Sequence, residues 1–228
     1  MFLSTFELLL NASQLPRKIE GIPPSALSIF KPISRNVLQG YFLTISNLEN
    51  RDVTLKFVFT VVSSITPQNR FEETEDVFGQ RTVSIFFDSN GKNEELRFKR
   101  SITTDLDGSN TTEKSTNSAM LTLKPRDTGL LLVQPDPTRI TKPLNTSEIE
   151  LRGHVEVTQL KSDEEGFGVA RVLLTPEHRG TFYSLDIPTL GNGEVDRTQP
   201  VTLPKEQQLD QIAYALPTAT GSSLFELS

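Results

Sequence analysis

The sequence contains no cysteine and no tryptophan, and it has only three tyrosines and two histidines among 228 residues. Without cysteine the protein has no thiol nucleophile, no disulfide and no cysteine-ligated metal, and this composition fits a reducing compartment. Carbohydrate-binding β-sandwiches and proteins that bind single-stranded nucleic acid usually rely on aromatic platforms. The absence of tryptophan therefore disfavours both of these function classes.

Positive charge and long apolar runs are also scarce. The 23 Lys and Arg residues are scattered and outnumbered by 29 Asp and Glu residues, so the net charge of −6 gives no general attraction to nucleic acid or to an anionic membrane. No apolar run approaches the length of a membrane span. The first residues, MFLSTFELLLNASQ, lack a basic region and include Glu7, so we expect no secretory signal and a cytoplasmic protein.

Motifs for catalysis are missing as well. The sequence has no Gly-x-Ser-x-Gly elbow, no Walker loop and no dinucleotide fingerprint. Adjacent carboxylates occur at 72–73, 94–95 and 164–165, but neighbours on a strand point to opposite faces and those on loops are normally solvated. We therefore expect a protein that is not an enzyme and needs no cofactor. A hydrolase whose two carboxylates are distant in the sequence stays open as an alternative.

The clearest positive signal is an alternation of apolar and polar residues over 41–62, which read YFLTISNLENRDVTLKFVFTVV. Two alternating runs flank a polar turn at 47–52. A period of two is typical of a half-buried strand, because successive side chains point to opposite faces, and no helix would gather the same residues on one stripe. The apolar face of the second run consists of Val53, Leu55, Phe57, Phe59 and Val61.

Further strands are expected along the body of the chain. A turn at Asn90-Gly91 links strands at 81–88 and 94–102, since Asn-Gly tolerates the positive φ of a tight hairpin. The apolar run 130–133 predicts a strand buried on both faces. Other strands are expected at 119–124, 149–160, 169–174 and 181–185. Eight or nine short strands over 37–185 predict an all-β, antiparallel sandwich of immunoglobulin-like type, with a jelly roll or barrel as the alternative.

The two ends differ from this body. Residues 1–36 are proline-rich and predict an extended N-terminal arm, with a short helix at about Thr5 to Ala12 because Ser4 and Glu7 fit a capping box. Residues 186–228 predict a proline-rich C-terminal tail. One short helix is expected there from Lys205 to Leu216, where apolar residues recur at helical spacing.

Two places could bind a ligand. Asp105 and Asp107, in the polar stretch 103–118, look like the start of a calcium loop, but the glycine comes two places early and the twelfth position is Thr116, so a solvated loop is the favoured interpretation. Glu177, His178 and Arg179 lie in a predicted turn and could bind an anion or a partner's carboxylate. An exposed loop with weak local ion pairs is the favoured alternative. His154 falls among charged residues on the solvent side of a strand, where a structural role is expected.

Several apolar residues occupy outward positions of the alternating strands. Four of them together indicate that part of this face is covered, either by the arm or tail of the same chain or by another subunit. The ends also resemble each other, at 4–8 (STFEL) and 223–227 (SLFEL), which suggests docking of both ends into equivalent grooves. The predicted contact residues are Phe6, Leu9, Phe42, Val58, Val62, Phe86 and Phe225.

These observations favour a non-enzymatic β-sandwich that acts through protein–protein contact or self-association, as a structural subunit, an assembly component or an adaptor. A module that binds a small ligand or a cation is the first alternative, and a hydrolase with dispersed carboxylates is the second. A fold by itself does not decide between them, because function depends on the site that the fold carries.

Overall fold

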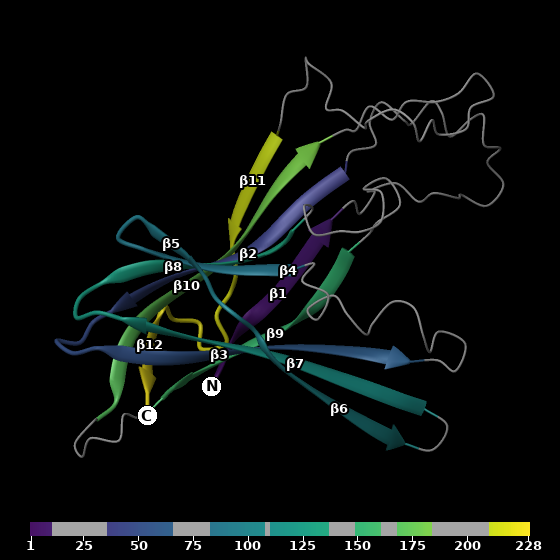
Figure 1. The fold of residues 1–228 in the computed structure, drawn as a ribbon, viewed down its shortest axis with the longest axis horizontal. Coiled ribbons are helices and arrows are strands. Elements are labelled where there is room, and N and C mark those ends of the chain that lie inside the picture. The colour runs from purple at the N-terminus through teal and green to yellow at the C-terminus, as the bar shows by residue number, and fades with distance from the viewer. Residues whose placement is uncertain (11–35, 66–82, 108–109, 137–148, 161–167, 184–209) are drawn as a thin grey trace.

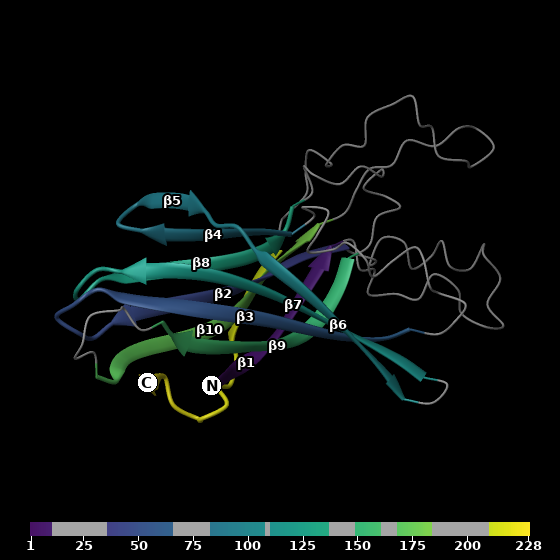
Figure 2. The same ribbon diagram turned by 60° about the horizontal axis from the view of Figure 1, so that its bottom comes forward.

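The structure is a computed structural model that describes residues 1–10, 36–65, 83–107, 110–136, 149–160, 168–183 and 210–228 (Figure 1). Every regular element in these ranges is a β-strand, and every pairing is antiparallel. The strands form one sheet that curls into half of a barrel (Figure 2). The all-β prediction is therefore confirmed. Within the described ranges no helix is long and apolar enough to cross a membrane.

Twelve strands are described. The central path of the sheet has the order β5-β4-β8-β2-β1-β9-β3-β7-β6, while β10 pairs with β2 and carries β11 and β12 on its other edge. The strands are β1 (Phe2–Leu10), β2 (Asn36–Asn47), β3 (Val53–Ile65), β4 (Val83–Ser89), β5 (Lys92–Glu95), β6 (Lys99–Asp107), β7 (Asn110–Leu123), β8 (Thr128–Pro135), β9 (Ile149–Gln159), β10 (Ala170–Tyr183), β11 (Asp210–Ala215) and β12 (Leu224–Leu227).

The curl of the sheet originates at β2. Tyr41 pairs with both His178 of β10 and Val133 of β8, so these two strands lie on opposite edges of β2. Gln39 pairs with Gly180 of β10 and with Leu9 of β1, so β1 shares an edge of β2 with β8. Because β8 and β1 pair with the same edge of β2 at different points along its length, the strands that follow them separate into two parts of the sheet. One part of the sheet continues through β8, β4 and β5, and the other continues through β1, β9, β3, β7 and β6.

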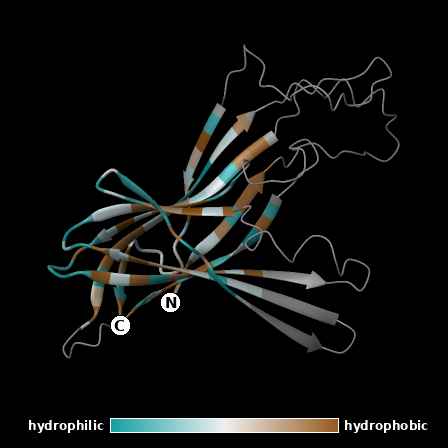
Figure 3. Cartoon of the chain, viewed as in Figure 1, coloured by the Kyte–Doolittle hydropathy of each residue, from teal (hydrophilic) through white to brown (hydrophobic). Residues whose placement is uncertain are grey.

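The inward faces of both parts fill one core. Brown and paler positions alternate along the strands in Figure 3, as the period of two predicts. On β3 the residues Val53, Leu55, Phe57 and Phe59 are fully buried, while Lys56 and Val58 between them are half-buried. Other core side chains include Leu3, Phe6 and Leu8 of β1, Tyr41, Leu43 and Ile45 of β2, Leu131 and Val133 of β8, Val155 and Val157 of β9, and Val172 and Leu174 of β10.

Two turns follow directly from their sequences. Asn90 (φ 55°) and Gly91 (φ 73°) both adopt positive φ, which confirms the predicted hairpin between β4 and β5. In the turn after β2, the buried Asn47 side chain donates from Nδ2 to the carbonyls of Arg51 and Lys124, each at 2.8 Å. Its Oδ1 accepts from the backbone N–H of Glu49 at 2.9 Å. One amide thus satisfies partly buried backbone groups from two segments of the chain.

Both short helices predicted at the ends are wrong where the structure describes them. Residues 2–10 form β1, which lies between β2 and β9 instead of forming part of an arm, and residues 210–215 form β11 on the edge of β10. The capping-box and helical-spacing patterns are local preferences. Pairing along neighbouring strands and burial of Phe6, Leu8 and Leu10 outweigh them. The remaining parts of the predicted arm and tail, 11–35 and 184–209, lie outside the described residues.

The predicted turn at 176–180 is also wrong, because β10 continues through it. The N and O atoms of one strand residue point to the same edge, and the Pro176 carbonyl accepts a hydrogen bond at 2.9 Å from Leu216, on the edge away from β2. On that edge β12 pairs only up to Leu173, and β11 pairs only from Glu177. Pro176 therefore lies between two ladders, at a position where its missing N–H breaks no hydrogen bond with β2.

Candidate interaction face and the buried His178 cluster

The predicted ligand group Glu177–His178–Arg179 is divided between two faces of β10. Successive residues of a strand point to opposite sides, so His178 points inward and the other two point outward. His178 is only 5% exposed, whereas Glu177 is half-buried and Arg179 is exposed. The three side chains therefore do not form one ligand-binding group. The favoured alternative, in which these residues form an exposed loop, is also wrong, because all three belong to β10.

Both ring nitrogens of His178 are engaged. Nε2 accepts a hydrogen bond from the backbone N–H of Glu7 at 2.9 Å, and Nδ1 lies 2.9 Å from the hydroxyl of Tyr214. Because Nε2 accepts, the neutral ring carries its proton on Nδ1 and donates it to Tyr214. Burial lowers the pKa of His178, and the nearby Glu7 carboxylate opposes that shift. The ring is neutral and has no lone pair left for proton abstraction, so its role here is structural.

The Glu7 carboxylate extends this cluster to two more strands. It accepts from Nε2 of Gln39 at 2.9 Å and from Nε of Arg152 at 2.5 Å. Together with His178 and Tyr214, these residues connect β1, β2, β9, β10 and β11. Close by, Tyr41 is fully buried and shares a hydrogen bond of 3.0 Å with Ser4, and burial raises its pKa while this bond opposes the shift. Such a network positions strands and offers no nucleophile.

His154 is placed on the outward face, as predicted. Its ring centroid lies 4.5 Å from that of Phe2, and its strand neighbours Arg152 and Glu156 are exposed and half-buried, respectively. Phe2 is half exposed. The ring therefore packs against an aromatic neighbour at the surface.

The outward face of β4, β8, β2 and β10 carries a row of apolar side chains. Leu132 is paired with Phe42 on one side and with Phe86 on the other. Paired residues project to the same face. All three side chains are half-buried. The row ends in carboxylates, since Phe86 is paired with Glu95 and Phe42 with Glu177. We call Phe42, Leu132 and Phe86 the apolar row.

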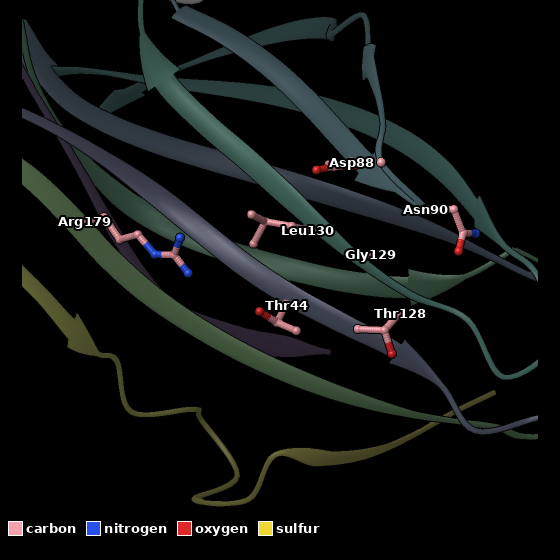
Figure 4. A pocket seen from close by; sticks show the side chains of 8 residues that line it. Thr44, Asp88, Asn90, Thr128, Gly129, Leu130 and Arg179 are labelled. Carbon is pink, nitrogen blue, oxygen red and sulfur yellow. The ribbon is translucent and has the colours of Figure 1, made fainter.

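An open depression of about 290 Å³ adjoins this row (Figure 4). Arg179 and Asp88 enter it from opposite sides, with Leu130 between them in the view of Figure 4. Asp88 is exposed and has no charged partner among the residues that the structure describes. The lining residues are Thr44, Asp88, Asn90, Gly91, Thr128, Gly129, Leu130 and Arg179.

Arg179 is held in place by two contacts on its own face. Its Nε donates to Oε1 of Glu177 at 3.0 Å, its Nη2 donates to the same oxygen, and its guanidinium carbon lies 4.6 Å from the centroid of the Phe42 ring. Gly40 makes room for this stack, because a Cβ there would lie 3.2 Å from Cε2 of Phe42 and 2.9 Å from the carbonyl oxygen of Val133. The arginine thus covers one end of the apolar row and keeps Nη1 for a further acceptor.

The predicted contact residues fall into separate places. Phe42 and Phe86 meet in the apolar row, whereas the half-buried Val58 lies on β3, paired with Glu156 of β9. Leu9 is half-buried on β1. Phe6 and Phe225 are 2% and 1% exposed, so their prediction as surface contacts is wrong: both point into the core. The side chain of Val62 lies outside the described part of the chain.

Leu132 was missed because the run 130–133 predicted burial on both faces. In the structure Leu131 and Val133 are buried, while Leu130 and Leu132 are half-buried on the outward face. The strict alternation of a strand could have identified them as outward residues. The alternation was not recognised because the residues on both faces of this strand are apolar.

The two predicted cation ligands lie on β6, in a stretch expected to be a loop. The backbone of Asp105 is paired with Thr112 and that of Asp107 with Asn110. The structure does not describe the side chains of either aspartate. Among the described residues no group of three His, Asp or Glu side chains is placed to hold a metal ion. The cation site stays a prediction.

No protein-family model, no curated protein and no solved structure matches the chain. The geometry of the outward face and that of the His178 cluster are therefore the basis on which function is inferred.

Proposed function

We propose that the protein acts through protein–protein contact and that the outward face of β4, β8, β2 and β10 is the contact surface. The observation that supports this most directly is the apolar row, which brings Phe42, Leu132 and Phe86 together from three strands. Interface centres are typically enriched in aromatic residues and arginine and surrounded by polar residues. The stacked Arg179 and the carboxylates at the ends of the row fit this composition.

The shape of the face favours a macromolecular partner over a small ligand. Sites for small molecules are concave and bury most of the ligand surface. The depression beside the apolar row is open and lies on the pleated surface of a sheet, with strands as its floor. A partner that lies across several strands can contact both the depression and the row.

The depression gives little support to the hydrolase alternative. Among the described residues that line it, one is a carboxylate, Asp88, one is a cation, Arg179, and none is a histidine. A glycosidase-type pair needs two carboxyl groups that face one another across the substrate. The buried His178 is the other candidate base, but both of its nitrogens are engaged on the opposite face of β10.

The immunoglobulin-like architecture predicted from the sequence is also part of what we propose. We interpret the two parts of the curled sheet as the layers of an immunoglobulin-like sandwich that share one core and remain joined through β1 and β2. The support is the single cluster of buried side chains to which both parts contribute. An adaptor or assembly subunit of this type would present the outward face of one layer. The cytoplasmic location stays a prediction.

A pair of matched variants tests the contact surface. Phe42→Asp places a charge in the apolar row, and Val58→Asp makes the same kind of change at another half-buried outward position, on β3. Association is measured by light scattering and by affinity capture at concentrations up to about 100 µM, where a micromolar Kd is detectable. We expect Phe42→Asp to abolish association and Val58→Asp to preserve it, with both variants folded by circular dichroism. Equal binding by both variants, or no association of the wild-type chain with any protein, would contradict the proposal.

A further inference from the structure

We infer that the partner of the outward face adds an extended strand to the free edge of β11, and that this strand carries apolar residues at alternate positions. This inference rests on the proposed function, since it describes how the same partner continues beyond the apolar row. Three features of β11 point to it: unpaired backbone groups, two exposed apolar side chains, and a position beside the row that contains Phe42.

One edge of β11 has no strand beside it. Among the strands that the structure describes, β11 pairs only with β10, and Figure 1 shows it at the outer limit of the sheet. The N–H of Leu216 donates to the carbonyl of Pro176 at 2.9 Å, so in the same antiparallel ladder every second residue, Tyr214 and Ile212, also points its backbone groups toward β10. The residues between them point their N–H and C=O groups away from β10, where no described strand meets them. These residues are Gln211, Ala213 and Ala215.

This edge lacks the features that usually keep a sheet edge from pairing, which are charged side chains, prolines, bulges and very short strands. Of the other described strands with an unpaired edge, β5 has three charged residues among four, β6 has four among nine, and β12 has only four residues. β11 has six residues in unbroken register and no proline, and its only charged residue is Asp210 at its first position. Residues 211–215 are all exposed. Among the described edges, β11 is therefore the one best suited to accept another strand.

The side chains of β11 indicate which kind of strand fits. Ile212 and Tyr214 are each 42% exposed, and Tyr214 is paired with the buried His178, so both project to the inward face of the sheet. Apolar residues at alternate positions of an added strand would lie directly beside them and cover them. On the other face Ala213 and Ala215 are small and exposed, so they leave room for larger side chains of the added strand.

The size and the position of this edge favour the partner of the outward face as the source of the strand. Ala215 is paired with Glu177, and Glu177 is paired with Phe42, so a partner on the apolar row reaches the edge of β11 along one row of the sheet. Pairing of β11 with a second copy of itself would join six residues on each side, whereas a stable interface has about 20–30. The edge therefore extends a larger contact, as in recognition by strand addition, where main-chain hydrogen bonds supplement side-chain contacts.

A synthetic strand tests the edge in the absence of the partner. The probe is the peptide Lys-Thr-Val-Thr-Val-Thr-Val-Lys at about 2 mM, a concentration at which a Kd of about 1 mM is detectable. We expect it to shift the backbone NMR signals of Gln211, Ala213 and Ala215 and to slow hydrogen exchange of their amides. When the valines lie beside Ile212 and Tyr214, the N–H groups of the threonines point toward β11. N-methylation of the threonine amides should abolish binding, and N-methylation of the valine amides, which point away, should preserve it.

Ala213→Pro is the matching change in the protein. The N–H of Ala213 points away from β10, so proline removes a free donor and no hydrogen bond of the ladder between β10 and β11. We expect this variant to bind the peptide at least about ten-fold more weakly than the wild type. Ala213→Val enlarges the same side chain but keeps the N–H, so it should retain binding. Circular dichroism and denaturant unfolding show whether both variants are folded. Phe42→Asp should bind the peptide as the wild type does, because the peptide does not contact the apolar row.

Three results would overturn the inference. No shift in β11 at this peptide concentration, or shifts confined to β5 or β6, removes β11 as the acceptor. A wild-type chain that has the mass of a dimer, with an Ala213 amide that is protected without peptide and loses protection on dilution, makes a second copy the occupant. Equal capture of a protein by the wild type and by Ala213→Pro, when Phe42→Asp captures none, leaves the contact surface correct and the added strand wrong. Peptide binding at β11 together with capture that Phe42→Asp does not affect would instead contradict the contact surface and retain β11 as the site.

Discussion

The imidazole of His178 makes a hydrogen bond with the edge of β1 that a neighbouring strand would otherwise make. Its Nε2 accepts from the backbone N–H of Glu7 at 2.9 Å. β1 pairs with β2 only through Leu9 and Leu10 and then leaves that edge, so the N–H of Glu7 has no carbonyl from β2 opposite it. An unpaired N–H at a half-buried position would be costly. The side chain from β10 supplies the acceptor and so joins β1 to β10.

This contact predicts a dependence of stability on pH. Burial lowers the pKa of His178 below its ordinary value of 6.5, so the unfolded chain binds a proton at a higher pH than the folded chain does. The free energy of unfolding should therefore fall as the pH decreases from about 7 toward the lowered pKa, with a slope approaching about 1.4 kcal/mol per pH unit. Denaturant unfolding at pH 7.5, 6.5 and 5.5, about one unit apart, measures this slope.

The matched variant for this prediction is His178→Gln. Its amide oxygen can accept from Glu7 and its amide nitrogen can donate to Tyr214, but the side chain does not titrate in this range. Tyr41 and Tyr214, whose rings contact His178, and Glu7, whose N–H it accepts, stay unchanged. Arg152, which binds the Glu7 carboxylate, also stays unchanged. We expect a smaller pH dependence in the variant. An identical dependence in both proteins would show that another group is responsible.

Gly153 is predicted to tolerate no side chain. A Cβ at this position of β9 would lie 2.0 Å from the carbonyl oxygen of Thr60 and 2.8 Å from Cε1 of Phe6. The first contact is with the backbone of the adjacent β3, which moves only if the pairing of β3 with β9 is disturbed. Gly153→Ala should therefore lower the free energy of unfolding by about 3 kcal/mol or more.

Gly168→Ala is the control for this substitution, because nothing lies within 4 Å of a Cβ at that position. Its effect should stay within about 0.5 kcal/mol. Denaturant unfolding of both variants gives the comparison. Similar free energies for the two variants would contradict the close approach of β9 to β3.

Asn47 is predicted to stabilise the end of β2 through its amide. Asn47→Ala leaves the carbonyls of Arg51 and Lys124 without their donor and should cost about 1–3 kcal/mol. Asn50→Ala in the same turn removes only an exposed acceptor for Arg126, and we expect less than about 1 kcal/mol. Thermal and denaturant unfolding would reveal the difference, and a larger effect at Asn50 would contradict this account of the turn.

The strand register is predicted to separate neighbouring residues of β3. Phe57 is fully buried, so Phe57→Ala should cost about 3–5 kcal/mol, whereas Lys56→Ala on the outward face should change stability by about 0.5 kcal/mol or less. The free energies of unfolding of the two variants measure this. Comparable losses would mean that the inward face of β3 has been assigned to the wrong residues.

Some features of this protein follow from short stretches of sequence. The alternation in Val53–Ile65 places Phe57 and Phe59 inward whatever the partner strands are, because the period of a strand is a property of its own backbone. The hairpin at Asn90 and Gly91 is equally local, since positive φ is a preference of these residue types. The all-β class and the outward positions of Phe42 and Phe86 could be predicted for this reason.

The contact between those outward residues could not be predicted in the same way. Phe42, Leu132 and Phe86 belong to strands that are distant in the sequence, and they form a row only because β4, β8 and β2 pair in one register. The alternation that identifies Phe42 as outward identifies Val58 equally well, yet Val58 lies on the other part of the sheet. The local pattern predicts which face of its own strand a residue occupies. Only the pairing of strands decides which of these residues lie side by side.

Sequence alone determined that this chain forms antiparallel strands, because side-chain alternation and turn preferences act within a few residues. Tertiary structure alone decided that residues 2–10 form a central strand, that His178 is buried and that Arg179 stacks on Phe42. The physical reason is that each of these features depends on hydrogen bonds or packing between segments far apart in the chain. Such contacts outweigh a capping pattern, whose own energetic preference is small, whereas Pro176 is accommodated because its missing N–H breaks no hydrogen bond with β2.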